Sequence, residues 1–168
     1  MYQVGEHVMY RNNGICTVEA VGKTSFSEKS GLDYYTLRPV YENDKSRFYV
    51  PVKADQFIRT AITKEETYQC LTELARLQTK PFCSKRPAEL AEHYDKLLIG
   101  NDMIDHLTLY KELCQKEKTA KETGKRFGQL DSNYKNQVEK LLSDEFSCAL
   151  GEAQETTKER LHQAVALS

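Results

Sequence analysis

The side chains best able to do chemistry are scattered along this chain of 168 residues. Five cysteines lie far apart, with no C-x-x-C pair among them: Cys16, Cys70, Cys83, Cys114 and Cys148. Four histidines have neither H-x-x-x-H nor H-x-x-E spacing: His7, His93, His106 and His162. Disulfide frameworks and zinc sites need closely and regularly spaced ligands. The sequence predicts neither, and we expect buried cysteines that act as small hydrophobic residues.

The remaining residues give little support for an enzyme. The chain has no P-loop or other Gly-rich phosphate cradle, no nucleophile beside a base and no paired carboxylates. Cys83 lies two residues from Lys85, which alone does not activate a thiol. We therefore expect a non-enzymatic protein without catalytic residues, cofactor or metal. The missing P-loop also excludes a nucleotide-driven motor protein.

Overall composition is that of a folded, water-soluble protein. Hydrophobic residues make up 39% of the chain and charged residues 29%, and 24 basic side chains nearly balance 25 acidic ones. The mean hydropathy is −0.66. No apolar run approaches the ~18 residues of a membrane span, and the first six residues lack the features of a secretion signal. We expect a cytoplasmic protein that does not associate with membranes.

Composition changes near residue 60. Short runs of β-branched and aromatic residues, separated by glycines, give way to long stretches rich in Leu, Lys, Glu and Ala. This order predicts an α+β chain: a small SH3/Tudor-like β-barrel over residues 1–62, followed by an all-α domain of about five helices over residues 63–168. Such barrels usually bind partners.

Turn residues mark the strands of the first module. Residues 7–10 and 15–21 flank Arg11-Asn12-Asn13-Gly14, and Asn-Gly supplies the positive φ angles of a tight hairpin. A second hairpin joins residues 34–40 to residues 47–52 through the polar loop 41–46. Pro51 cannot donate to a β-ladder, which places the last run at a sheet edge or a strand end.

Capping residues mark the helices of the second module. Thr63 and Glu66 form a capping box, Pro87 suits a first helical turn, and Asn101 or Asp102 can cap a third helix. The expected helices cover residues 64–78, 88–99, about 103–123, 131 or 132 to 150, and 155–167. Their leucine-rich stripes are typical of a bundle core. The third expected helix should face inward with an apolar stripe that consists of Ile104, Leu107, Tyr110, Leu113 and Cys114.

Four motifs of the first module occur in the order found in a known family. They are V-G-E-H-V-M-Y at 4–10, N-G-I-C at 13–16, Y-Y-T-L at 34–37 and Y-V-P-V at 49–52. Together they resemble the N-terminal module of the CarD (CarD/CdnL/TRCF) bacterial transcription regulators. In the second module, Leu98–Asp102 resembles that family's S-G-D joint, and Leu141–Phe146 resembles its final leucine-rich helix. The resemblance extends to about residue 152.

The resemblance implies a transcription regulator with two partners. Its N-terminal module would bind the RNA polymerase β subunit. Its helical module would contact promoter DNA in the minor groove, at the upstream edge of the bubble near the −10 element, and modulate open-complex stability. The family commonly inserts a Trp there, but this chain has none. Counting back from Gly100 puts Phe82 at that position, where a Phe can still act as an apolar wedge.

Charge placement agrees with a DNA contact. Residues 76–86 carry four basic side chains and no acidic one, and residues 111–126 carry six basic against three acidic. Residues 131–159 are acidic and should face away from phosphate. Near-zero net charge predicts weak DNA binding by the chain alone, which tethering to polymerase can offset. The predicted DNA-binding residues are Lys80, Phe82, Lys85 and Arg86.

The predicted polymerase-binding residues are Arg47, Tyr49 and Pro51, which could add a strand of the partner to the sheet edge. One alternative function is a Tudor-like protein-interaction adaptor without direct DNA binding. A related alternative is an aromatic cage for methylated lysine, built from Tyr34, Tyr35, Phe48 and Tyr49. Strand alternation instead favours some of these four filling the barrel core. We expect a monomer.

Overall fold

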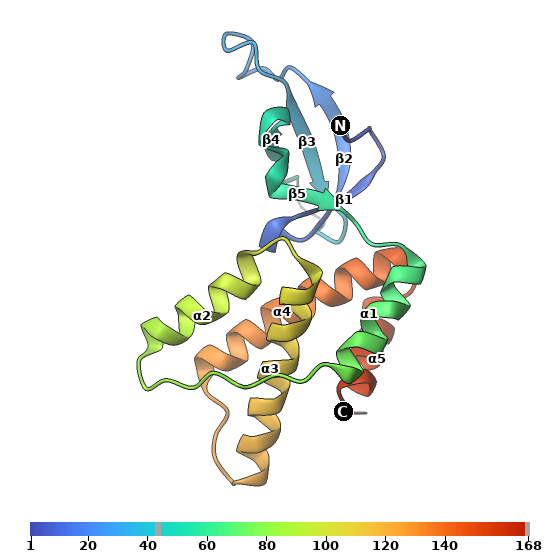
Figure 1. The fold of residues 1–168 in the computed structure, drawn as a ribbon. Coiled ribbons are helices and arrows are strands. Elements are labelled where there is room, and N and C mark those ends of the chain that lie inside the picture. The colour runs from blue at the N-terminus through green and yellow to red at the C-terminus, as the bar shows by residue number, and fades with distance from the viewer. Residues whose placement is uncertain (43–44, 167–168) are drawn as a thin grey trace. The chain divides into compact units, whose positions relative to one another are not determined.

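The computed structural model describes residues 1–42 and 45–166. They fall into two compact units, Met1–Ala61 and Ile62–Ser168, and each is described by itself. The first unit holds an antiparallel sheet and the second holds the helices (Figure 1). The predicted α+β class, with a Tudor-like unit followed by a helical one, is confirmed. No helix in the described ranges is long and apolar enough to cross a membrane.

Five strands form the sheet of the N-terminal unit, counted over residues 1–42 and 45–61. They are β1 (His7–Tyr10), β2 (Ile15–Gly22), β3 (Tyr34–Pro39), β4 (Phe48–Pro51) and β5 (Ile58–Thr60). Their order is β4-β3-β2-β1-β5, so β4 and β5 are the edge strands (Figure 1). Pro51 is the last residue of β4, in agreement with its expected place at an edge and a strand end.

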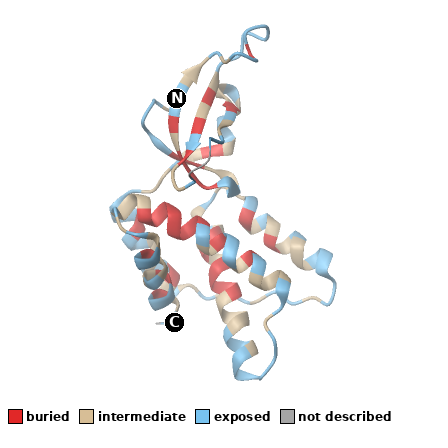
Figure 2. Cartoon of the chain, turned by 180° about the vertical axis from the view of Figure 1, so that it is seen from behind, coloured by how far each residue is buried: buried red, intermediate tan, exposed pale blue. Residues whose placement is uncertain are grey.

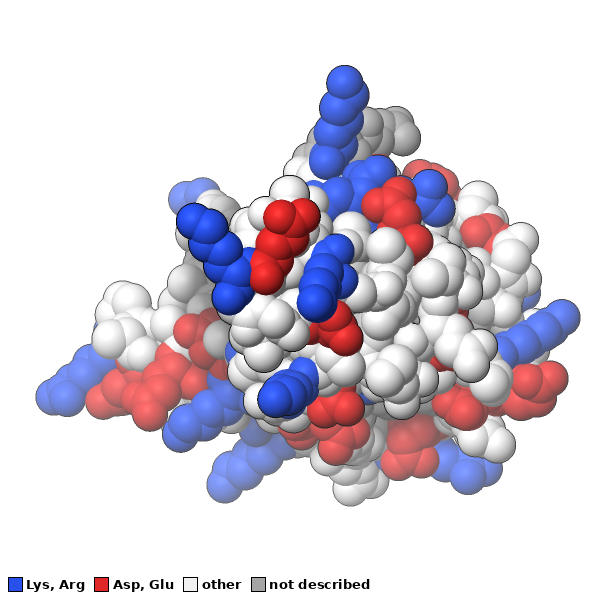
Figure 3. All heavy atoms as spheres, turned by 90° about the horizontal axis from the view of Figure 1, so that it is seen from above, with Lys and Arg blue, Asp and Glu red and all other residues white. Residues whose placement is uncertain are grey.

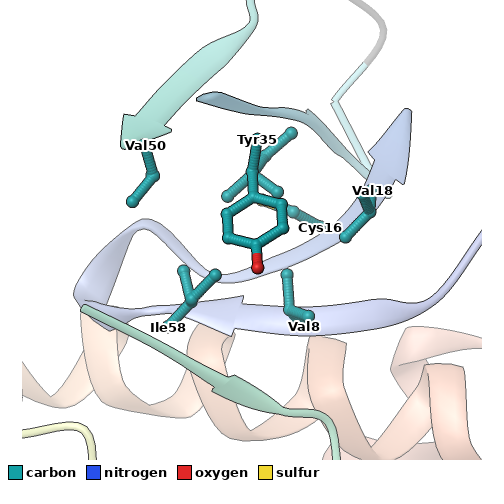
Figure 4. Close-up of a cluster of buried hydrophobic side chains, with 7 residues drawn as sticks. Val8, Cys16, Val18, Tyr35, Val50 and Ile58 are labelled. Atoms are coloured by element: carbon teal, nitrogen blue, oxygen red, sulfur yellow. The ribbon is translucent and has the colours of Figure 1, made fainter. Parts of the chain in front are cut away.

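The core of this unit is built around Tyr35 of β3. Figure 4 shows its ring surrounded by Val8, Cys16, Val18, Val50 and Ile58, and its side chain is fully buried. The hydroxyl accepts a hydrogen bond from the backbone N–H of Tyr2 at 3.1 Å. The buried polar atom is therefore satisfied, which is what a barrel this small requires.

The β1–β2 turn differs in detail from the prediction. Gly14 has the expected positive φ, +97°, but the other positive φ of this turn belongs to Arg11, at +47°, which is the first residue of the 3₁₀ turn η1 (Arg11–Asn13). The Arg11 guanidinium lies 3.6 Å from the centroid of the Phe57 ring. This cation–π contact offsets part of the cost of placing a non-glycine residue in left-handed backbone.

Five α-helices form the described part of the second unit, residues 62–166. They are α1 (Lys64–Arg76), α2 (Pro87–Ile99), α3 (Met103–Glu122), α4 (Gln129–Leu150) and α5 (Gln154–Ala166). The Thr63 hydroxyl accepts from the N–H of Glu66, as the capping box predicts, and Asp102 is the residue that caps α3. α4 begins earlier than expected because Gly128 serves as its N-cap. Residue 167 of the expected fifth helix and residues 43–44 of the expected polar loop lie outside the described residues.

Helix α3 packs against α1, α2 and α4, and this changes which of its residues are buried. Leu107, Tyr110 and Leu113 are buried as expected, and Cys114 is half-buried. Ile104 is exposed instead, so its predicted inward orientation is wrong. A helix contacted on three sides also buries residues off its main stripe, as Figure 2 shows where the helices meet. The extra buried side chains are His106, Leu109, Lys111 and Glu112.

Candidate functional site

Edge strand β4 carries two of the residues singled out from the sequence. Thr36 of β3 lies opposite Tyr49, and Tyr34 lies opposite Pro51. Because Val50 points into the core, alternation turns the neighbouring Tyr49 outward, where 46% of it is exposed. On its other side β4 has no neighbouring strand among the described residues. The free backbone groups of such an edge can pair with a strand of another protein.

Arg47, the third of these residues, is bound within its own unit. Its Nε lies 2.6 Å from Glu19 Oε2 and its Nη2 lies 3.2 Å from Glu19 Oε1, a bidentate ion pair between the residue that precedes β4 and strand β2. The hydrogen bonds from Arg47 lower the pKa of the Glu19 carboxyl. Arg47 therefore helps to hold the edge strand, and a partner carboxylate would have to compete with Glu19.

An exposed aromatic cluster, which was not predicted from the sequence, lies beside this edge. Phe26, from the loop between β2 and β3, makes edge-to-face contacts with Tyr34 (centroids 5.2 Å apart) and Tyr49 (5.0 Å apart). Phe26 is 57% exposed. We call Phe26, Tyr34 and Tyr49 the edge aromatic cluster. An aromatic side chain in a mostly polar loop, residues 23–33, was the signal that could have pointed to it.

The four aromatic residues considered for a methyl-lysine cage do not line one cavity. Tyr35 is fully buried, and Phe48 packs against the same core. Tyr34 and Tyr49 lie on the outward face of the sheet, where Phe26 contacts both. The cage hypothesis is wrong because strand alternation divides the four residues between the two faces.

In the helical unit, Phe82 lies in the connector, which we define as residues 77–86 between α1 and α2. Its ring stacks on the imidazole of His93 in α2, with centroids 4.5 Å apart and planes 22° apart. Phe82 remains 36% exposed. One face of the Phe82 ring is thus covered by His93, and the rest of the side chain is partly exposed to solvent.

The backbone of Phe82 is fixed to α3 by two buried or partly buried charges. Its N–H donates to Glu112 Oε1 at 2.7 Å, and its carbonyl accepts from Lys116 Nζ at 3.0 Å. His93 Nε2 lies 3.0 Å from both oxygens of Glu112, which is almost fully buried. One carboxylate therefore anchors both the connector and the ring on which Phe82 stacks.

Lys116 extends this network to α4. Its Nζ lies 3.1 Å from Asp131 and 2.7 Å from the hydroxyl of Tyr94, which itself donates to Asp131. Burial, and then the carboxylate that accepts its hydrogen bond, raise the pKa of Tyr94. The network fixes the shape of the connector, because each buried polar group in it has a partner.

The predicted basic residues around Phe82 are all exposed, but they are not equivalent. Arg86 pairs with Glu89 at 3.4 Å. Among the described residues, no ion pair involves Lys80 or Lys85. The hollow beside the Phe82 ring is lined by Glu89, Glu92, His93 and Lys96, and Lys96 pairs with Glu92. The ring therefore faces a surface that is not basic.

Two wider observations bear on function. Within residues 1–42 and 45–166, no group of three or more His, Cys, Asp or Glu side chains could hold a metal ion. In the view of Figure 3, basic and acidic side chains are interspersed over the visible face. On this face neither sign of charge dominates, in keeping with the net charge of −1.

Comparison with known protein families gives a match in the N-terminal unit. Residues 2–62 match the family model described as "CarD-like/TRCF RID domain", a family of RNA polymerase-interacting, transcription-related domains. The matched residues coincide with the sheet of the N-terminal unit. A comparison with curated proteins found no match. The resemblance drawn from the motifs of the first module is confirmed.

Proposed function

Because residues 2–62 belong to the CarD-like/TRCF RID domain family, we propose that this chain is a bacterial transcription regulator that docks on the β subunit of RNA polymerase. The N-terminal unit makes this contact, and the helical unit contacts promoter DNA at the upstream edge of the bubble. The chain thereby modulates the stability of the open complex.

One observation supports the docking half most strongly: an open sheet edge with exposed aromatic side chains beside it, within the matched domain. β4 offers main-chain hydrogen bonds to an added strand. The edge aromatic cluster offers apolar contact area next to it, and aromatic residues are enriched among those that dominate interface energies. Tyr49 belongs to both features, so it is the residue on which docking depends most.

The DNA half is supported by the way the connector presents Phe82. A wedge that enters a base step must be exposed and must be held by a support that does not move with it. Phe82 meets both conditions, since its ring is partly exposed while Glu112 and Lys116 fix its backbone. Lys80 and Lys85 lie on the same connector and supply positive charge for the flanking phosphates.

The proposal requires the two contacts to act together. A chain of net charge −1 gains little nonspecific affinity for DNA. Docking on polymerase raises the local concentration of the helical unit at the promoter, so a weak contact there can still shift the lifetime of the bubble. We expect DNA binding by the chain alone to be weak and strongly salt-dependent.

Capture of purified bacterial RNA polymerase core enzyme by the full chain tests the docking half. We expect capture through the β subunit by the wild-type chain and loss of capture by Tyr49→Pro, because proline removes an N–H from the edge strand. The control variant is Tyr68→Ala, which changes an exposed tyrosine of the helical unit. Equal capture by Tyr49→Pro would contradict docking at β4.

A second candidate function is a protein-interaction adaptor that does not touch DNA. One observation favours it: the acidic residues Glu89 and Glu92 line the hollow beside Phe82. An adaptor would bind polymerase and leave the lifetime of the open complex unaffected by Phe82→Ala. The regulator proposed above would lose part of its effect on that lifetime.

A further inference from the structure

The chain passes from the sheet to the helices within very few residues. Strand β5 ends at Thr60 and helix α1 begins at Lys64, and the boundary between the two compact units lies between Ala61 and Ile62. A long flexible segment at this point would let the two units move independently of each other. Whether these few residues are free depends on the partners of their backbone groups.

The backbone of Ala61 is bound to the sheet. Its N–H donates to the carbonyl of His7, the first residue of β1, at 3.1 Å. This hydrogen bond extends by one residue the antiparallel pairing of β1 with β5, in which Val8 lies opposite Thr60. Because a peptide group is planar, the sheet holds the whole peptide group between Thr60 and Ala61.

The backbone of Ile62 is bound to the helical unit. Its N–H donates to Glu145 Oε2 at 3.0 Å. Glu145 lies in α4 and is only 1% exposed, so its carboxylate is held among buried side chains. Hydrogen bonds to an ionised acceptor are stronger than those between neutral groups. Helix α4 therefore holds the next peptide group, which joins Ala61 to Ile62.

The chain is also fixed directly after Ile62. The carbonyl of Thr63 accepts from the N–H of Thr67 at 3.0 Å and from its hydroxyl at 2.8 Å. Thr67 is fully buried, and the Thr63 hydroxyl caps α1. The helix thus begins without a free residue between its cap and the peptide group that Glu145 holds.

Only two backbone torsions separate the peptide group held by His7 from the peptide group held by Glu145. They are φ and ψ of Ala61, because the peptide groups on both sides of its Cα atom are planar. Steric contacts of an L-residue restrict these two torsions to a few regions. The two units can therefore change their relative orientation at one residue, but they cannot move apart.

We propose that Ala61 is a single-residue hinge between the two units and that Glu145 is the positioning residue that confines the hinge to it. The consequence for transcription rests on the proposed function. When the N-terminal unit is docked on polymerase, the helical unit reaches only those positions that rotation about Ala61 allows. Its local concentration at one place on the promoter is then higher than a flexible linker would give.

Amide hydrogen exchange of the full chain, resolved by residue with NMR, tests the hinge. We expect the amides of Ala61 and Ile62 to be protected in the wild-type protein. Glu145→Leu should lower the protection of Ile62 by about 10-fold or more and leave that of Ala61 unchanged. Glu145→Gln is the matched control, because its amide oxygen can still accept this hydrogen bond.

Rapid exchange of Ile62 in the wild-type protein would overturn the hinge, and this measurement decides even if Glu145→Leu fails to fold. Unchanged protection of Ile62 in a folded Glu145→Leu protein would overturn the role of Glu145.

Insertion of two glycines between Ala61 and Ile62 tests the consequence for transcription. The insertion keeps both hydrogen-bonded anchors, which amide exchange verifies, and adds flexible backbone between them. We expect the variant to capture polymerase as the wild-type chain does but to lose most of its effect on the lifetime of the open complex. A full effect would overturn the positioning role of the hinge. A wild-type chain that docks and leaves the lifetime unchanged would contradict the proposed function, while the exchange data would still decide the hinge.

Discussion

The ring of Phe82 lies flat on the imidazole of His93, with the two centroids 4.5 Å apart. Both residues are tied to the same buried carboxylate, because Glu112 accepts from the N–H of Phe82 and lies within hydrogen-bond distance of His93 Nε2. The imidazole of His93 thus covers one face of the Phe82 ring, and the buried carboxylate of Glu112 holds both residues. This support allows a partly exposed Phe to keep one orientation.

Phe82→Ala should separate a structural role from a role in binding. Loss of one aromatic stack on a partly exposed residue should lower the free energy of unfolding by about 1 kcal/mol. Loss of a wedge at a base step should cost about 1–3 kcal/mol of open-complex stability. Thermal unfolding and the decay of polymerase–promoter complexes measure the two effects, and Phe82→Trp should lengthen the decay. A lower melting temperature with an unchanged decay would mean that Phe82 is only structural.

Phe26→Ala should weaken polymerase binding without affecting the fold. Phe26 is 57% exposed and contributes little burial, whereas truncation of an aromatic at the centre of an interface commonly costs 10-fold or more in affinity, ~2 kcal/mol. Titration against core polymerase, with thermal unfolding in parallel, measures this. Tyr68→Ala serves as the control for an exposed aromatic outside the matched domain. Undiminished affinity of Phe26→Ala would remove the edge aromatic cluster from the docking surface.

Lys111→Met should destabilise the helical unit while leaving the N-terminal unit intact. The Lys111 ammonium donates to the carbonyls of Leu74 and Ala75 near the end of α1. Methionine keeps most of the packing but leaves these buried acceptors without a donor. Removing a charged hydrogen bond of this kind costs ~1–3 kcal/mol. Denaturant unfolding should show the loss, and Lys118→Met, an exposed site on the same helix, should not.

Alkaline pH should destabilise the protein through its buried thiols. Burial raises the pKa of Cys16 to about 12 and that of Cys114 to about 11, from an ordinary value of 9.0. The folded state thus holds these protons more tightly than the unfolded state. The resulting stabilisation is fully present below pH 9.0 and is lost as pH rises through about 11 and 12. The free energy of unfolding should fall over that window. In the Cys114→Ala variant, the free energy of unfolding should fall less steeply with pH than in the wild-type protein. Equal slopes for the two proteins would contradict this assignment.

Local sequence signals predicted the elements of the fold well because most of them act over a few residues. Gly14 marks the first hairpin, Pro51 marks the end of an edge strand, and Thr63 and Asp102 cap their helices. The Arg11 conformation was not predictable in this way. The Arg11 guanidinium contacts the ring of Phe57, which is distant in sequence, so no local signal marks this contact.

The candidate surfaces were less predictable because they depend on packing between elements. Lys111 and Glu112 look like a solvated pair in the sequence, and only the contacts of α3 on three sides bury them. The basic stretch 111–126 contains six cations, but burial removes Lys111 from the surface, and ion pairs occupy Lys116 and Lys121. Phe26 lies in a polar loop and joins Tyr49 only through the sheet.

The lifetime of the polymerase–promoter open complex tests the central claim most directly. It is measured after a competitor challenge, with the wild-type chain, Tyr49→Pro, Phe82→Ala or no added protein. We predict that the wild-type chain changes the lifetime several-fold, that Tyr49→Pro has no effect because it does not dock, and that Phe82→Ala docks but has a reduced effect. A wild-type chain that is bound to polymerase and leaves the lifetime unchanged on every promoter tested would contradict the account.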